Sequence, residues 1–375
     1  MSLSELSVSD LGQIVTGKTP STKNPAFFDG EYQFVTPSDL DWKTYYCQST
    51  ERTVTEDAKQ ILNNQFIPAN TVMVTCIGNT IGKCGLSSGL CLTNQQINSI
   101  IPHDGIDSKF VYYLLVQNTD VIRGFGLGGG AATPILNKNA FARIKLRVPP
   151  KQRWANIASI LSAYDDLIEN NRRRIQLLEQ AARLLYKEWF VRLRFPGHEH
   201  IKITNDIPEG WEKKPLGDVA PLKYGRALKN EDRISGPFPV YGSSGIIGTH
   251  TKPLVSGPTI IVGRKGNVGS VYWSPDDCHP IDTVYFIDSE RCSFFLYYSL
   301  QQMNFISTDV AVPGLNRDFA HSRSILVADQ KILRFFEDTV LPLHQQMELL
   351  KKQASALAQA RNLLLPRLMN GEISV

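Results

Sequence analysis

Apolar positions that recur every seven residues predict two long helices. Between residues 151 and 192 the chain has no glycine or proline, and two rows of mostly apolar or small residues repeat at heptad spacing. The rows are Ile157, Tyr164, Asn171, Leu178 and Leu185, and Leu161, Ile168, Ile175, Ala182 and Trp189. Two such seams are typical of a coiled coil rather than of a surface helix.

The C-terminal segment repeats this pattern. Its rows are Phe336, Leu343, Leu350, Leu357 and Leu364, and Val340, Met347, Ala354, Arg361 and Leu368. Pro342, early in the pattern, predicts a helix boundary or a kink. Asn171 and Arg361 lie in the seams, where we expect them to fix register and pairing. The first helix leads to a second globular segment and the second helix has no third to reach, so we expect the two to pair antiparallel.

The chain also repeats itself outside the helices. The stretch TVMVTCIGNTIGKCG at 71–85 returns as TIIVGRKGNVGSVY at 259–272, each an apolar run, a glycine-rich turn and a second strand. The helical pattern at 110–115 returns at 295–300, and P-x-L-N at 134–137 returns at 313–316. Leu11-Gly12 with Gly17-Lys18 returns as Leu216-Gly217 with Gly225-Arg226. Each copy ends in a long helix, which indicates a duplication.

The glycine-rich stretch GFGLGGGAATPILN at 124–137 has a superficial likeness to a phosphate-binding loop. Such a loop needs a strand before it and a helix N-terminus after it, whereas a helical pattern precedes this stretch and Pro134 follows. The second copy keeps the P-x-L-N but lacks the glycine run. We therefore predict a mobile loop. The stretch IGNTIGKC at 77–84 also lacks the spacing and the Ser or Thr of a nucleotide loop.

Together these elements predict an α+β protein. Two similar globular α/β domains are separated by two long helices that pair as an antiparallel coiled coil, with pseudo-two-fold symmetry. We place the first domain at 1–150, the first helix at 151–195, the second domain at 196–328 and the second helix at 329–375.

Composition narrows the class of protein. A chain of 375 residues with 42% hydrophobic content supports two or three folded units. The six cysteines form no C-x-x-C pair, which favours reduced thiols in a cytoplasmic protein without a metal site. The N-terminus lacks the pattern of a signal peptide, and no apolar run reaches the roughly 18 residues of a membrane span.

Positive charge is concentrated in one segment. The net charge of +4 is small, but residues 143–194 hold twelve basic and five acidic residues, a surplus of seven positive charges. The segment is either a solvated helix face or a surface near a phosphate backbone or an acidic partner.

Several stretches resemble the specificity subunit of type I restriction–modification systems. They are TGKTPSTKNPAFFDGEYQFVTPSDL at 16–40, IPEGWEKKPLGDV at 207–219 and FPVYGSSGIIG at 238–248. The glycine turns and the P-x-L-N before each helix are also similar to that family. The resemblance covers essentially the whole chain, including the order domain, helix, domain, helix.

This resemblance implies a role in DNA recognition. The domains at 1–150 and 196–328 would be target-recognition domains, each reading one half of a gapped, asymmetric sequence in double-stranded DNA. The helices would set the gap and dock two methyltransferase subunits, which modify adenine with S-adenosylmethionine. A motor-nuclease subunit is a further partner that the resemblance allows. The specificity subunit itself would have no catalytic role and bind no cofactor.

The chain agrees with this interpretation in lacking catalytic motifs. It has no N/D-P-P-Y/F motif of an adenine methylase and no Walker A motif. Asp276 and Asp277 follow a proline but are not followed by a D/E-x-K pattern at nuclease spacing.

DNA-reading residues are expected in glycine-rich loops, because Arg and Lys pair with guanine and Asn and Gln with adenine. In the first domain the candidates are Lys18, Thr19, Ser21, Lys23, Asn24, Asn79, Thr80, Lys83, Asn94, Gln95 and Gln96. In the second they are Lys223, Arg226, Lys229, Ser243, Ser244, Arg264, Lys265, Asn267 and Arg317. Asn137 and Asn316 are instead expected to cap the following helices.

Two other functions remain open from the sequence. The chain could be a coiled-coil adaptor whose globular units bind proteins, with the basic segment as a docking face. It could also be an enzyme with an unfamiliar site, which binding of S-adenosylmethionine by the isolated chain would indicate.

Overall fold

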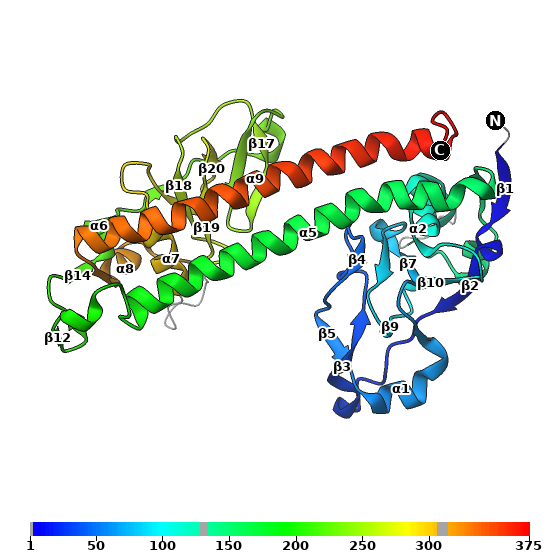
Figure 1. Ribbon diagram of the computed structural model, residues 1–375, viewed down its shortest axis with the longest axis horizontal. Coiled ribbons are helices and arrows are strands. Elements are labelled where there is room, and N and C mark those ends of the chain that lie inside the picture. Colours follow the sequence, from blue (N-terminus) through cyan, green and yellow to red (C-terminus); the bar gives the residue numbers. More distant parts are fainter. Residues whose placement is uncertain (1–2, 128–133, 306–313) are drawn as a thin grey trace. The chain divides into compact units, whose positions relative to one another are not determined.

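The protein divides into two compact units. The structure, a computed structural model, describes residues 3–127, 134–305 and 314–375. Unit 1 comprises Met1–Arg172 and Lys351–Val375, and unit 2 comprises Arg173–Leu350. Both long helices therefore contribute to both units (Figure 1).

Unit 1 is built on mixed β-sheets. One sheet has the strand order β2-β10-β7-β8-β4, another has β5-β3-β9-β6, and β1 pairs with β11. The strands are β1 Ser4–Ser7, β2 Gly12–Thr16, β3 Phe28–Val35, β4 Tyr46–Cys47, β5 Arg52–Val54, β6 Phe66–Ile67, β7 Val72–Thr75, β8 Cys84–Ser87, β9 Cys91–Thr93, β10 Ile97–Pro102 and β11 Lys145–Val148. The strands β7 and β8 are buried along their whole length, as the apolar run of β7 predicts for that strand.

Short helices pack on these sheets, α1 (Glu56–Leu62) on β3 and α2 (Ser108–Gln117) on β7, β8 and β10. They are followed by α3 Thr119–Leu127 and α4 Lys138–Ala142. Residues 110–115 of α2 are all buried because the helix packs on β7, β8 and β10 and against the first turns of α5 (Trp154–Tyr186). The rings of Phe110 and Trp154 stack with centroids 4.4 Å apart. This contact anchors α5 to the sheet of unit 1.

Unit 2 has a related arrangement. Its sheets have the orders β15-β21-β18-β19 and β17-β16-β20, with pairs β14-β22 and β12-β13. The strands are β12 Ile203–Thr204, β13 Ile207–Pro208, β14 Glu212–Pro215, β15 Lys223–Tyr224, β16 Phe238–Gly242, β17 Gly245–His250, β18 Thr259–Gly263, β19 Val271–Ser274, β20 His279–Pro280, β21 Val284–Ile287 and β22 Ser324–Val327. The helices are α6 Leu216–Val219, α7 Phe294–Gln302, α8 Arg317–Ser322 and α9 Gln330–Met369.

The two long helices pair antiparallel, as predicted. In unit 1, Leu161 near the start of α5 shares a buried cluster with Leu365 near the end of α9. In unit 2, Trp189 in the π-helical turn Lys187–Val191 that extends α5 packs on Phe336 near the start of α9, with ring centroids 5.7 Å apart. All twenty predicted seam residues are buried or half-buried, which confirms the heptad pattern.

Some sequence expectations are wrong. Pro342 does not end a helix, because α9 runs without interruption from Gln330 to Met369. The proline loses one backbone hydrogen bond, but buried Val340 and Met347 hold the helix in place on either side. A kink at Pro342 stays a prediction.

Two further expectations need correction. Gly124 to Leu127, assigned to a loop, are helical in α3, and residues 128–133 of that stretch lie outside the described residues. The match of Leu11 with Leu216 is shifted by three residues. The N–H of Val8 donates to the Ile144 carbonyl (3.0 Å) as the N–H of Leu216 donates to that of Arg323 (2.8 Å), so Val8 is the equivalent of Leu216.

Candidate nucleic-acid interface

The opening loop of unit 1 lies against the loop after β9. The N–H of Lys18 donates to the carbonyl of Thr93 (2.9 Å), and Thr19 Oγ1 donates to Gln95 Oε1 (2.7 Å). Gly17 permits this contact, because a Cβ there would lie 2.1 Å from the Thr93 carbonyl oxygen. The structure thus brings together candidate residues that lie 76 positions apart in the chain.

The glycine turn after β7 meets the same loops. The N–H of Cys76 donates to the carbonyl of Gln96 (2.8 Å), and the N–H of Leu136 donates to the carbonyl of Cys76 (2.9 Å). Asn94 is only 9% exposed, and its Oδ1 accepts from the N–H of Gln96 (3.0 Å). Asn94 therefore orders its own turn, while Gln95 on the same turn is exposed.

The other candidates of unit 1 differ in their surroundings. Ser21, Lys23 and Asn79 are exposed. Asn24 Oδ1 accepts from the N–H of Ala26 (3.2 Å) and so caps a short 3-10 turn. Thr80 Oγ1 donates to the Ile77 carbonyl (2.7 Å) within the glycine turn. Lys83 Nζ donates to the carbonyl of Leu40 (2.9 Å), so this ammonium group is directed at the protein.

Unit 2 repeats this hydrogen-bond scaffold. The N–H of Arg226 donates to the carbonyl of Pro280 (3.0 Å), as Lys18 does to Thr93 in unit 1. The N–H of Arg264 donates to the carbonyl of Thr283 (2.9 Å), and the N–H of Leu315 donates to that of Arg264 (2.8 Å). The glycine turn and the P-x-L-N segment of each unit are therefore held in the same way.

These hydrogen bonds identify which residues of the two units are equivalent. Arg264 is equivalent to Cys76, and Gly225 is equivalent to Gly17. A Cβ on Gly225 would lie 2.1 Å from the carbonyl oxygen of Ile281 and 2.6 Å from that of Pro280, and a Cβ on Gly17 would meet the carbonyl oxygens of the equivalent Asn94 and Thr93 at 2.4 and 2.1 Å. The predicted duplication thus extends to backbone contacts, whereas the side chains at equivalent positions differ.

Tyr224, which sequence reasoning did not select, lies among the arginines of unit 2. The guanidinium carbons of Arg264 and Arg317 are 5.0 and 5.1 Å from its ring centroid. Tyr285 stands 5.0 Å from Tyr224 between ring centroids, and its hydroxyl donates to the Leu315 carbonyl (2.9 Å). The one sequence signal for Tyr224 was its place directly before Gly225, at the matched glycine step.

The remaining candidates of unit 2 divide into paired and exposed residues. Lys223 forms an ion pair with Asp288, and Lys229 lies 3.6 Å from Glu231. The carbonyl of Ser243 accepts from Ser270 Oγ (2.7 Å). Lys223 and Lys229 are exposed despite these ion pairs, and so are Arg226, Ser244, Lys265 and Asn267.

Both predicted caps are confirmed. Asn137 Oδ1 accepts from the N–H of Ala140 (2.9 Å) at the start of α4. Asn316 Oδ1 accepts from the N–H groups of Asp318 (2.8 Å) and Phe319 (3.1 Å) at the start of α8. These caps fix the first helical turn after each P-x-L-N.

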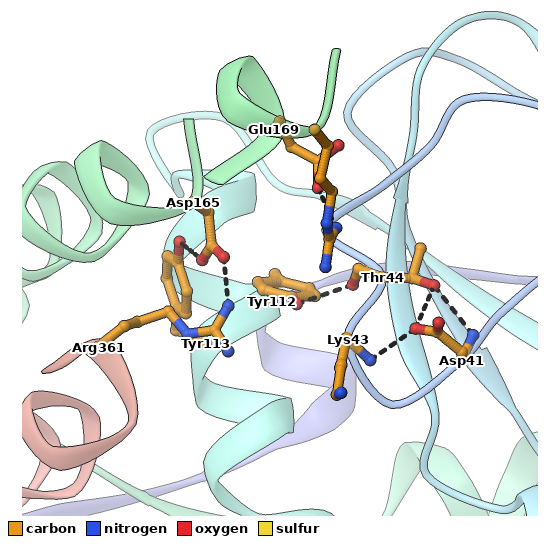
Figure 2. A network of polar contacts seen from close by, with 9 residues as sticks. Asp41, Lys43, Thr44, Tyr112, Tyr113, Asp165, Glu169 and Arg361 are labelled. Atoms are coloured by element: carbon orange, nitrogen blue, oxygen red, sulfur yellow. Dashed lines mark hydrogen bonds and ion pairs between the residues drawn. The ribbon is translucent and has the colours of Figure 1, made fainter. Parts of the chain in front are cut away.

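A buried polar network ties α2, α5 and α9 together in unit 1 (Figure 2). Asp165, with a side chain 2% exposed, pairs with Arg361, whose side chain is 14% exposed. Tyr113 Oη donates to Asp165 Oδ2 (2.6 Å). Burial raises the pKa of Asp165, and the Arg361 guanidinium opposes that rise. The sequence placed Arg361 in a seam but overlooked Asp165, which shares a helix face with Leu161 through i, i+4 spacing.

Adjacent to this network, a surface loop is fastened to α2. Tyr112 Oη donates to the carbonyl of Thr44 (2.8 Å). Asp41 Oδ1 accepts from the N–H of Lys43 (2.6 Å) and from Thr44 Oγ1 (3.0 Å). The loop before β4 therefore has a defined conformation, as Figure 2 shows.

The thiols are suited to a structural role. Burial raises the pKa of Cys76 to about 11 and that of Cys91 to about 12, so both are neutral thiols at pH 7. Within residues 3–127, 134–305 and 314–375, no three His, Cys, Asp or Glu side chains are grouped so as to hold a metal ion. In the same ranges no helix is both long and apolar enough to cross a membrane.

Comparison with known proteins finds one family. Residues 4–180 and 208–338 match the family model described as type I restriction modification DNA specificity domain. The type I restriction enzyme MjaIX specificity subunit of Methanocaldococcus jannaschii is 28% identical, over 98% of this chain and 93% of its own length. The HindI specificity subunit of Haemophilus influenzae is 33% identical, over 46% of this chain and 38% of its own length.

A solved structure shares the fold. The crystal structure of a type I restriction–modification S subunit from M. genitalium superposes with a TM-score of 0.60 at 18% identity, covering 98% of this chain and 96% of the other. The α+β fold class with two related domains and long helices is thereby confirmed.

Proposed function

The chain belongs to the type I restriction–modification DNA specificity family, whose role is recognition of DNA sequence, and we propose how its two units divide that task. Each unit reads one half of a gapped, asymmetric target in double-stranded DNA. The helices α5 and α9 set the gap and dock two methyltransferase subunits. The methyltransferases modify adenine with S-adenosylmethionine, and a motor-nuclease subunit can join the complex. This chain carries no catalytic group and binds no cofactor.

The observation that carries this proposal is the duplicated loop scaffold with unlike side chains. Backbone hydrogen bonds at the two interfaces match, from Lys18 and Arg226 to Leu136 and Leu315. The exposed side chains on that frame differ, with Gln95 in unit 1 and Lys265 in unit 2 as examples. A constant frame with variable donors is what reading two different half-sites requires.

Tethering explains why two weak readers suffice. Once one unit has bound its half-site, the other is confined near its own, which raises its effective concentration. The connection is helical: α5 alone, with 33 residues, is about 50 Å long at about 1.5 Å per residue. Stiff connectors restrict binding to half-sites at one separation and one helical phase, so the gap becomes part of the target.

The surface of α5 offers a place for partner proteins. In unit 2, Leu177, Leu184 and Val191 are 55%, 59% and 53% exposed. Leu177 and Leu184 are seven residues apart and lie in one row of α5, apart from the buried seam residues. Val191 lies beyond them, in the π-helical turn Lys187–Val191. An exposed apolar row of this kind is suited to a protein partner, and we assign it to a methyltransferase subunit.

The gap-setting role is tested by shortening both helices equally. Removing residues 173–176 and 350–353 shortens each helix by about 6 Å and changes its rotation by about 40° beyond a full turn. One base pair changes DNA length by about 3.4 Å and its rotation by about 35°. The rotation corresponds to about one base pair and the length to about two, so we expect the complex with methyltransferase subunits to protect the same two half-sites with the gap shortened by about one to two base pairs.

A length-preserving variant provides the control. Arg173→Ala with Arg174→Ala removes two charges from the same segment and is expected to leave the gap unchanged. A single continuous footprint for the native complex would contradict the two-reader model. Partner binding that is indifferent to DNA sequence would favour the protein-binding adaptor instead.

A further inference from the structure

We propose that Arg264, stacked on Tyr224, recognises a guanine in the half-site of unit 2, with Arg317 holding the adjacent phosphate backbone. This inference rests on the proposed function and assigns one base type to one side chain. It predicts that the half-site of unit 2 contains a G·C pair at the position facing the glycine turn after β18.

Arg264 is held ready for a base before DNA binds. Its backbone is fixed on both sides by hydrogen bonds to Thr283 and Leu315. Its side chain is half-buried, with the guanidinium 5.0 Å from the ring of Tyr224 and 5.6 Å from that of Tyr285. Because this side chain is already ordered, little rotamer entropy is lost on binding. Nη1 also donates to the carbonyl of Asp282 (3.3 Å), so bidentate donation to guanine O6 and N7 uses the remaining N–H groups of this fixed planar fork.

Arg317 is placed differently. It follows the cap Asn316 as the first residue of α8, its side chain is 43% exposed, and its Nε lies 3.9 Å from Asp318. A long exposed cation at this position reaches phosphate oxygens rather than a chosen base edge. The two guanidinium groups share the ring of Tyr224 and repel each other, so a phosphate or a guanine acceptor near them is favoured.

Unit 1 lacks this stack although its scaffold is the same. The backbone bonds make Thr16 the equivalent of Tyr224, Cys76 that of Arg264 and Asn98 that of Tyr285. In unit 1 these side chains bond to one another: Thr16 Oγ1 to Asn98 Oδ1 (2.6 Å) and Asn98 Nδ2 to Cys76 Sγ (3.2 Å). The fold therefore does not require arginine and tyrosine here, which supports a role in recognition.

The experiment uses the full chain assembled with its methyltransferase subunits. The half-site of unit 2 is first assigned with an iron chelate attached at Ser244→Cys, which cleaves nearby DNA; the native thiols are buried or half-buried. Binding is then measured to a set of duplexes in which each base pair of both half-sites is replaced in turn.

The variants separate base reading from general attraction. Arg264→Ala should lose discrimination at one G·C pair of the unit 2 half-site by roughly 5- to 150-fold, which corresponds to about 1–3 kcal/mol. Tyr224→Phe keeps the ring and should behave as the native protein, whereas Tyr224→Ala should reproduce part of the loss. Arg317→Ala should weaken all sequences alike and lower the salt dependence by about one counterion.

Three outcomes would overturn the inference. They are a unit 2 half-site without G·C, an Arg264→Ala effect that is equal at every base pair, and an effect confined to the half-site of unit 1. In each of these cases two protected blocks would still support the proposed function. Absence of paired blocks for the native complex would refute the proposed function itself.

Discussion

Replacing Arg361 with methionine removes the cation that faces the buried carboxylate of Asp165. The side chain of Asp165 is 2% exposed, so water cannot take the place of the guanidinium. Tyr113 Oη still donates one hydrogen bond to the carboxylate. Breaking a buried ion pair from one side costs about 3–5 kcal/mol, because an uncompensated charge stays behind.

This loss of unfolding free energy corresponds to a large decrease in Tm. Unit 1 contains about 200 residues, and for such a size about 1 kcal/mol lowers Tm by roughly 2–4 °C. We therefore expect Arg361→Met to lower the Tm of unit 1 by roughly 6–20 °C. Calorimetry gives the shift, and hydrogen exchange of α2 identifies which unit unfolds.

The pH dependence provides a second readout. Burial already raises the pKa of Asp165 above its ordinary value, and losing Arg361 raises it further. A raised carboxyl pKa means that stability is lost as the pH rises through the folded-state value and regained below it. The deficit of Arg361→Met should therefore be largest near neutral pH and shrink in acid.

Two combined variants serve as controls for Arg361→Met. Asp165→Asn combined with Arg361→Met removes the titrating group, so its remaining deficit should not change with pH. Asp165→Leu combined with Arg361→Met and Tyr113→Phe removes all three polar partners and should be close to native in stability, since apolar side chains of similar volume replace buried ion pairs well. The reasoning is refuted if Arg361→Met alone is near native, or if its deficit grows in acid.

Three further predictions follow from single contacts. Tyr113→Phe removes the donor to Asp165 and should lower the free energy of unfolding by about 1–3 kcal/mol, measured by urea denaturation. Asn316→Ala removes the cap of α8 and should cost about 0.5–2 kcal/mol in the same assay, and a loss outside that range would question the cap. Gly225→Ala forces a Cβ to within 2.1 Å of the Ile281 carbonyl oxygen and should abolish protection of one half-site in footprinting while the other is retained.

Equivalent positions in the two units show how a duplicated scaffold diverges. Tyr298 Oη contacts His344 Nε2 at 2.8 Å in unit 2, where Tyr113 contacts Asp165 in unit 1. The ring of His344 stacks on Phe294 with centroids 4.0 Å apart. The two units thus fasten their helices with the same tyrosine but different partners on the long helix.

Local patterns in the sequence were enough to predict much of the fold. Heptad spacing marked both long helices, and the caps Asn137 and Asn316 follow from their place before a helix. The helix boundary predicted at Pro342 is wrong, because a proline early in a helical pattern ends a helix only when neighbouring contacts do not hold the helix in place. Leu11 instead of Val8 was matched to Leu216, because short apolar stretches carry too little pattern to fix a match to within three residues.

By itself, the sequence determined the duplication, the heptad seams and the family, since each is a pattern that can be read along the chain. Only the tertiary structure decided that Arg264 and Arg317 meet at Tyr224 and that Asp165 faces Arg361. Periodicity states which face of an element is buried. It does not state which side chain, from a segment far away in the chain, completes the contact, because that depends on how the sheets and helices pack.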